Sequence, residues 1–202
     1  MEEKRFASVE RETNETKIAV TVNLDGQGNF SGSTGNGFSD HLLAQLARHG
    51  MFDITVGIPR GDIHISWHHV TEDTAIVLGR AFLQARGEGR GIRRMGDKHA
   101  PLDETLARVV VDCSGRPYAV VDTSIDPDVM LEGVLPGDLV RHFLETFATE
   151  ARITLHAKVL YGKNPHHKAE AVFKALARAL REAHEPDSHA AGQVPSTKGT
   201  LS

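Results

Sequence analysis

Two copies of one short motif place metal-binding side chains in both halves of the chain. HHVTE spans 68–72 and HHKAE spans 166–170, about one hundred residues further on, and each copy opens an amphipathic run. Imidazole nitrogens and carboxylate oxygens are ligands that manganese, zinc and iron accept. One HHxxE alone is weak evidence, since His and Glu at helical spacing are common on protein surfaces. Its recurrence at matching places indicates a metal site.

Helical geometry divides the side chains of each copy between two directions. The first His and the Glu are four positions apart, so on a helix they lie on one face. The middle His points about 100° away, and one ion cannot easily bind all three. We therefore predict two metal ions, each bound by residues from both copies.

A third matched pair extends the repeat. His41 in a predicted first-half helix corresponds to His142 in a second-half helix, again about one hundred residues apart. Four protein ligands for each ion would leave room on a six-coordinate metal for water and substrate. Divided by the helix geometry, one ion would bind His68, Glu72, His142 and His167, and the other His41, His69, His166 and Glu170.

The same order of elements is predicted in both halves from alternating apolar residues in strands and apolar stripes in helices. The first half gives strands at 5–12, 16–24, 29–34 and 51–58, a short strand near Ile63 and Ile65, and helices within 35–50 and 69–85. The second half gives a hairpin at 106–122 around Ser114 and Gly115, a helix at 137–150, a strand at 152–160 and the HHKAE helix. We expect one compact domain with half-repeats at 1–100 and 101–185 and a tail at 186–202.

Two loops and the tail carry candidate phosphate-binding residues. Glycine-rich GEGRGIRRMGD at 87–97 follows a helix, whereas a dinucleotide-binding fingerprint needs its glycines after a strand, so we interpret it as a loop. Arg94 in this loop and Arg116 in a turn could grip phosphate, although pairing with a surface carboxylate is the simpler alternative. Ser196, Thr197 and Lys198 would form an anion site if the tail docks.

The composition excludes several classes of protein. The 202 residues carry a formal net charge of -4, so there is no basic field for nucleic acid. Cys113 is the only cysteine and allows no internal disulfide, and the opening MEEKR lacks the apolar core of a signal peptide. No apolar run approaches the roughly 20 residues that span a bilayer. We expect a cytoplasmic protein without nucleic-acid or membrane partners.

The remaining histidines have no counterpart in the repeat. We expect surface or structural roles for most of them. The exception is His49, because it ends the predicted helix that carries His41. They are His49, His64, His99, His156, His184 and His189.

Six blocks together resemble the imidazoleglycerol-phosphate dehydratase family. They are GFSDHLLAQLARHG, HHVTEDTAIVLGRAF, GRGIRRMGD, PLDETLARVVVDCSGRPY, YGKNPHHKAEAVFKALARAL and PSTKG, in the family's order and spacing, between about Arg11 and Leu201. The resemblance implies an α+β fold of the ribosomal protein S5 domain 2-like type: an internally duplicated domain with two four-stranded sheets flanking a four-helix bundle. It implies a hydro-lyase of histidine biosynthesis, with trimers assembling into a cage of twenty-four subunits and sites at subunit interfaces.

The resemblance also implies the ligands and the substrate contacts. It implies two Mn²⁺ ions per site, held by the eight residues above, six of which also line the substrate site: His41, His68, His69, Glu72, His166 and His167. The substrate would be imidazole glycerol phosphate. Its phosphate would be held by Arg94, Arg116, Ser196, Thr197 and Lys198, and its pocket lined by Gln45, His49 and Lys168. The catalytic carboxylates would be Glu72, Glu170 and Glu15, the last from a neighbouring chain.

A few positions depart from the family pattern. Gly37, Ala44 and Met95 differ from the residues that family members generally have, as do Ser66 and Trp67, which precede the first HHxxE. None of them is a predicted ligand. Ser66 and Trp67 could change the hydrogen bonding of the histidines that follow, and so the metal affinity.

The reaction itself sets the hypothesis for the mechanism. The proton on C2 of the substrate is not acidic, so the ring has to assist: held as an imidazolate between two Mn²⁺ ions, it could expel the C3 hydroxyl as a diazafulvene-like intermediate. Loss of the C2 proton would then give the enol of imidazole acetol phosphate. A binuclear metallohydrolase is an alternative, but the Asp-rich ligand sets are missing. A metal-storage cage would leave Arg94, Arg116 and PSTKG unexplained.

Overall fold

The computed structural model describes residues 5–190 and 192–201, and its two halves repeat one order of elements. The first half contains β1 (Phe6–Glu12), β2 (Lys17–Asn23), β3 (Phe30–Ser33), α1 (Gly37–Gly50), β4 (Asp53–Arg60) and α2 (His68–Arg86). The second contains β5 (Met95–Leu102), β6 (Thr105–Asp112), β7 (Tyr118–Asp122), α3 (Asp138–Glu150), β10 (Thr154–Tyr161) and α4 (Pro165–His184). Two small additions are the ribbon of β8 (Met130–Leu131) and β9 (Leu135–Pro136), and the 3₁₀ turn η1 (Ser188–Ala190).

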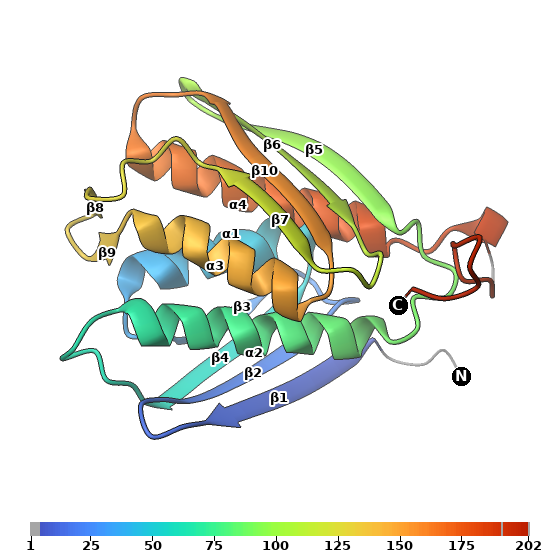
Figure 1. The fold of residues 1–202 in the computed structure, drawn as a ribbon, viewed down its shortest axis with the longest axis horizontal. Coiled ribbons are helices and arrows are strands. Elements are labelled where there is room, and N and C mark those ends of the chain that lie inside the picture. Colours follow the sequence, from blue (N-terminus) through green and yellow to red (C-terminus); the bar gives the residue numbers. More distant parts are fainter. Residues whose placement is uncertain (1–4, 191, 202) are drawn as a thin grey trace.

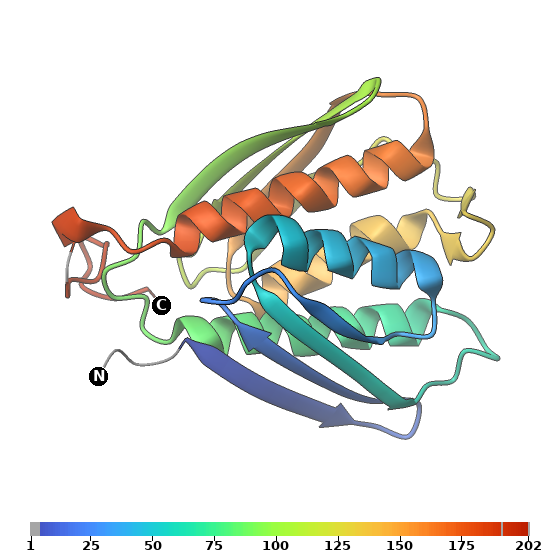
Figure 2. The same ribbon diagram turned by 180° about the vertical axis from the view of Figure 1, so that it is seen from behind.

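Both halves build the same sheet. The strand orders are β1-β2-β4-β3 and β5-β6-β10-β7, and in each the last strand pairs in parallel while the others pair antiparallel. Figure 1 shows the four helices between the two sheets. Figure 2, from behind, shows α1 beside α4, and α2 packs likewise on α3. The α+β duplicated architecture predicted from the sequence is confirmed.

The core lies between each sheet and the helices. Alternate residues of β2 and β6 point inward, among them Val20 and Val109, and four phenylalanines are almost fully buried between the layers. Gly79 lets α2 approach α3, because a Cβ there would lie 2.8 Å from the Glu150 Cβ and 2.9 Å from the Phe147 carbonyl oxygen. The close packing holds the N-terminal ends of the helices, where the HHxxE motifs lie, in fixed relation.

Two local predictions are wrong. The segment around Ile63 and Ile65 is a turn with both side chains more than half exposed, and no strand within 5–190 or 192–201 pairs with it. The residues at 106–122 do not form a hairpin: β10 inserts between β6 and β7 and pairs with both. The predicted boundary between the halves, at 100/101, falls inside β5, a strand of the second sheet that begins at Met95.

The C-terminal tail docks against the glycine-rich loop. The amide of Gly91 donates to the carbonyl oxygen of Gln193 at 2.8 Å, and Asp187 donates back to Gly91 at 2.8 Å. Arg94 donates to the carbonyl oxygen of Pro195 at 2.8 Å. The segment with Ser196 therefore lies next to Arg94, for which the family resemblance implies a phosphate-binding role.

Candidate active site

The two HHxxE motifs open α2 and α4, and each meets one histidine from a neighbouring helix. His68 and Glu72 of α2 gather with His142 of α3. His166 and Glu170 of α4 gather with His41 of α1. In each group one potential ligand atom per residue lies within 4.8 Å of the others. Three of the four ligands predicted for each ion therefore lie together within one chain.

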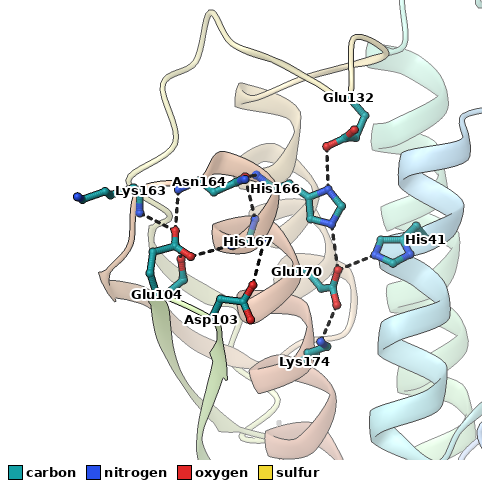
Figure 3. A network of polar contacts seen from close by, with 11 residues as sticks. His41, Asp103, Glu104, Glu132, Lys163, Asn164, His166, His167, Glu170 and Lys174 are labelled. Carbon is teal, nitrogen blue, oxygen red and sulfur yellow. Dashed lines mark hydrogen bonds and ion pairs between the residues drawn. The ribbon is translucent and has the colours of Figure 1, made fainter.

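The cluster on α4 is tightly hydrogen-bonded (Figure 3). The Glu170 Oε2 lies 2.7 Å from the His41 Nε2 and 3.1 Å from the His166 Nε2, and Lys174 contacts the other oxygen at 2.5 Å. Burial raises the pKa of Glu170, but hydrogen bonds from Lys174, His41 and His166 outweigh it and lower the pKa to about 2. Glu170 is therefore ionised at neutral pH, the form that binds a metal.

The cluster on α2 is looser, and one of its nitrogens forms no hydrogen bond with the described residues. The rings of His68 and His142 stack with centroids 4.7 Å apart, and the His142 Nε2 lies 3.5 Å from the Glu72 Oε1. That buried Nε2 forms no hydrogen bond with any described residue. A buried polar atom without a partner is costly, and a metal ion would satisfy it. The two imidazoles and the carboxylate are also donors suited to Mn²⁺, so the residues fit the metal.

The two middle histidines lie outside these clusters. The His69 Nδ1 lies 2.7 Å from the Asp62 Oδ2, with Glu15 at 3.8 Å. The His167 Nδ1 lies 2.7 Å from the Glu104 Oε2. Within one chain the fourth ligand predicted for each ion is therefore not at its cluster, as expected for side chains that point away from the first His and the Glu.

Helix capping explains how the second motif is presented. The Asn164 Oδ1 accepts hydrogen bonds from the backbone N–H groups of His166 and His167, at 2.8 and 3.4 Å, and Pro165 occupies the first turn. Helix α2 lacks such a cap at Trp67, although the Ser66 hydroxyl accepts from the His68 N–H at 3.1 Å. Of the positions that depart from the family pattern, Ser66 thus supports the start of α2.

The predicted substrate contacts fall into separate regions of one chain. Gln45 and His49 hydrogen-bond to each other at 3.1 Å on α1, and burial with nearby Lys174 lowers the pKa of His49. Lys168 instead donates to the carbonyl oxygen of Ser124 at 2.7 Å.

The predicted phosphate contacts lie at the end of the second sheet and in the tail. Arg94 forms a bidentate pair with Asp112, at 2.7 and 3.0 Å, so the carboxylate pairing that was the simpler alternative is present, and its remaining nitrogen meets the tail at Pro195. Arg116 is exposed in the turn after β6, and its amide donates to the Ser114 hydroxyl at 3.2 Å. Thr197 and Lys198 lie in the exposed turn that follows Ser196.

Sequence reasoning missed four charged residues that contact histidines or a glutamate of the HHxxE motifs. Lys174 follows Glu170 by one helical turn, and this spacing was a usable signal. The other three are carboxylates from loops that meet the Nδ1 of a motif histidine, one of them seven residues before its histidine and the other two 63 and 34 residues before theirs. They are Asp62, Glu104 and Glu132.

Comparison with known proteins decides the family. The sequence model of imidazoleglycerol-phosphate dehydratase matches residues 34–180. The chain belongs to the imidazoleglycerol-phosphate dehydratase family. It is 53% identical over 198 residues to the dehydratase of Dehalococcoides mccartyi strain 195, covering 98% of both chains, and 54% identical over 197 residues to that of Thermobifida fusca, covering 98% of this chain and 99% of the relative.

Solved imidazoleglycerol-phosphate dehydratases share the fold. The Staphylococcus aureus structure has a TM-score of 0.78 and 35% identity, covering 88% of this chain and 97% of the other. The Pyrococcus furiosus enzyme in complex with (S)-C348 has a TM-score of 0.75 and 34% identity, covering 95% and 99%. The family consists of metal-dependent hydro-lyases of histidine biosynthesis that act on a small phosphorylated substrate, so the predicted enzyme class is confirmed. None of the described helices combines the length and hydropathy needed to cross a bilayer.

Proposed function

We propose that this chain dehydrates imidazole glycerol phosphate to imidazole acetol phosphate with two Mn²⁺ ions in each site. The observation that supports the proposal most strongly is the pair of clusters at the N-terminal ends of α2 and α4, each with two histidines and one carboxylate. The clusters come from the two halves of a duplicated fold, so they provide two similar metal positions. A site with two metals suits a substrate whose imidazole ring has two nitrogens.

The chain's own residues would hold the metals in two sets. One set is His68, Glu72 and His142, and the other is His41, His166 and Glu170. We assign the fourth ligand of each set, His167 and His69 respectively, to a neighbouring copy, because both rings are held outside the clusters of their own chain. An assembly of trimers into twenty-four subunits would bring such copies together. When bound, the two ions supply Lewis-acid stabilisation of an imidazolate ring.

The phosphate would bind where the tail meets the second sheet. Arg94 lies beside the backbone of Pro195, next to Ser196, and Arg116 is exposed on a nearby turn. Together with Thr197 and Lys198 they supply guanidinium, hydroxyl and ammonium donors for phosphate oxygens. Binding the phosphate far from the reacting carbons orients C2 and C3.

The pocket wall would come from α1 and α4. Gln45 and His49 provide polar groups on α1. Lys168 would add a cation at the start of α4, where it donates to the Ser124 carbonyl oxygen, and Lys174 contacts the cluster carboxylate Glu170 one turn further along.

The carboxylates would have different roles in proton transfer. Glu170, with its pKa held at about 2, remains an anion and serves as a ligand that keeps its site charged. Glu15 is half exposed on the β1–β2 turn and lies 3.8 Å from the His69 Nδ1, with its carboxylate free to face a substrate. We assign Glu15 one of the proton transfers at C2 or C3, and Glu72 the ligand role that matches Glu170. Expulsion of the C3 hydroxyl through a diazafulvene-like intermediate would then make the C2 proton acidic.

Assaying the purified, assembled protein for ketone formation tests the proposal. With imidazole glycerol phosphate and Mn²⁺ we expect dehydration, and after chelation we expect turnover to cease and to return when Mn²⁺ is added. Phosphate release without ketone formation would indicate a binuclear hydrolase instead. Manganese binding without any turnover would indicate a storage protein and would overturn the proposal.

A further inference from the structure

The two middle histidines of the HHxxE motifs are held in the same way by carboxylates from different elements. The Nδ1 of His69 and that of His167 each lie 2.7 Å from a carboxylate oxygen. Asp62 comes from the loop between β4 and α2, whereas Glu104 comes from the turn between β5 and β6. These loops are not equivalent in the two halves. The turn of the first half that corresponds to the turn of Glu104 is the β1–β2 turn, and its Glu15 lies 3.8 Å from the His69 Nδ1, so Asp62 is a second carboxylate at this ring.

A carboxylate at Nδ1 determines which nitrogen of the ring can bind a metal. An ionised carboxylate only accepts hydrogen bonds, so the proton must lie on Nδ1. The lone pair is then on Nε2, and the ring cannot rotate without losing the bond. We propose that Asp62 and Glu104 are positioning residues that leave Nε2 as the only metal-binding atom of His69 and His167. The inference rests on the proposed function, in which these rings ligate the metals of a neighbouring copy.

Glu104 has a second task besides holding the ring (Figure 3). Its Oε1 accepts hydrogen bonds from the backbone N–H groups of Lys163 and Asn164, at 3.0 and 2.8 Å, while its Oε2 faces His167. The same side chain thus fixes the loop before α4 and the imidazole on its first turn. Both of its oxygens are acceptors in use, so an amide cannot replace this carboxylate.

Asp62 uses only one oxygen. Its Oδ2 meets His69, whereas its buried Oδ1 has no hydrogen-bond partner among the described residues. An amide could therefore place its oxygen on the Nδ1–H of His69 and its NH₂ at the position of Oδ1. The two positioning residues should respond differently to the same chemical substitution, and this difference provides the test.

The experiment measures the affinity of the assembled full-length protein for Mn²⁺, by titrating metal-free protein and following the electron paramagnetic resonance signal of free Mn²⁺. In Glu104→Gln we expect half of the sites to bind about 10- to 100-fold more weakly, as for other lost partners of metal ligands, and the other half to be unchanged. Asp62→Asn should bind like the wild type. Asp97→Asn is the matched control, because this carboxylate pairs with Arg108 across β5 and β6, beside Glu182 near the C-terminal end of α4 and away from the HHxxE motif.

Glu104→Gln could also act by loosening the loop before α4, so a second variant removes a carboxylate that does not hold a loop. Among the described residues the Asp62 side chain accepts a hydrogen bond from His69 and none from the backbone of another segment, so Asp62→Ala removes the carboxylate without loosening a helix. Glu15→Gln is combined with it, since the Glu15 carboxylate lies 3.8 Å from the same Nδ1 and could take its place. The double variant should weaken the half of the sites that Glu104→Gln leaves intact, relative to Glu15→Gln alone.

Each outcome decides the inference. Equal affinity in wild type, Glu104→Gln and the double variant would overturn it while the proposed function stands, provided that the wild type binds Mn²⁺ and forms ketone. Uniform weakening of all sites in Glu104→Gln would indicate a purely structural role and would also overturn it. A wild type that binds no Mn²⁺ would instead reject the proposed function itself.

Discussion

A buried histidine far from the metal clusters predicts how stability depends on pH. His184 ends α4 and is 3% exposed, with its Nδ1 donating to the Leu180 carbonyl oxygen at 2.8 Å. Its ring packs edge-on against Phe52 and Phe82. Burial lowers the pKa of His184 from 6.5 to about 4, and the positive charge of nearby Arg86 adds to the effect. The folded protein therefore holds this ring neutral.

The sign and size of the effect follow from the difference between the folded and unfolded pKa. Below pH 6.5 His184 is protonated in the unfolded chain, whereas in the folded chain it stays neutral until the pH falls to about 4. The contribution of the neutral His184 to the free energy of unfolding is fully present above pH 6.5. It is lost as the pH falls from 6.5 to about 4. The full loss is about 3 kcal/mol at about 1.4 kcal/mol per pKa unit, and about 2 kcal/mol is lost by about pH 5.

The assay compares urea unfolding of the wild type and of His184→Leu at about pH 7.5 and about pH 5. Leucine fills a similar volume between the phenylalanines and does not titrate, so groups common to both proteins cancel in the difference. Protein concentration is held constant because assembly is linked to folding. We expect the wild type to lose about 2 kcal/mol more than His184→Leu on acidification. Equal losses in the two proteins would refute the claim that burial keeps His184 neutral.

Three more perturbations follow from the site and its supports. Glu170→Gln should abolish turnover and lower bound manganese, measured by metal analysis, because the anion that meets His41 is lost. Deleting 194–202 should raise KM about tenfold or more in steady-state assays, since a lost hydrogen bond to a charged phosphate costs about 1.5 kcal/mol or more. Asp73→Asn should destabilise the fold by about 3 kcal/mol in urea unfolding, because the buried Asp73 accepts from Arg11 and Thr16.

Outcomes that contradict these expectations are equally specific. Normal activity with unchanged manganese in Glu170→Gln would remove that residue from the ligand set. An unchanged KM after the deletion would show that the tail is not a phosphate site. For Asp73, the control is Glu145→Gln, which breaks an exposed pair with Arg141 and should change stability by less than about 1 kcal/mol. Equal effects of the two substitutions would show that the buried pair adds nothing.

Local sequence pattern was sufficient for most of the helices and for the grouping of ligand candidates. The positions of His68 and Glu72 one turn apart fixed their common face, because helical geometry depends only on spacing. The repeat then related His41 to His142 and predicted that each would meet a motif from the other half, as the structure shows. Capping by Asn164 follows the same local rule.

Strand pairing and the surroundings of single side chains were decided by the tertiary structure. Nothing near 106–122 indicates that β10 inserts beside β7, because ladders join residues far apart in sequence. His184 has no mark of burial in its neighbours, yet the packing of α4 on two phenylalanines encloses it.

What the sequence determined by itself is the chemistry that is available: six imidazoles and two carboxylates at repeated positions, on helices whose faces follow from spacing. What only the tertiary structure decided is how those groups are divided and held. Glu104 reaches His167 from 63 residues away, and Glu132 reaches His166 from 34 residues away. The physical reason is that periodicity fixes directions along one element, whereas contacts between elements depend on how whole layers pack.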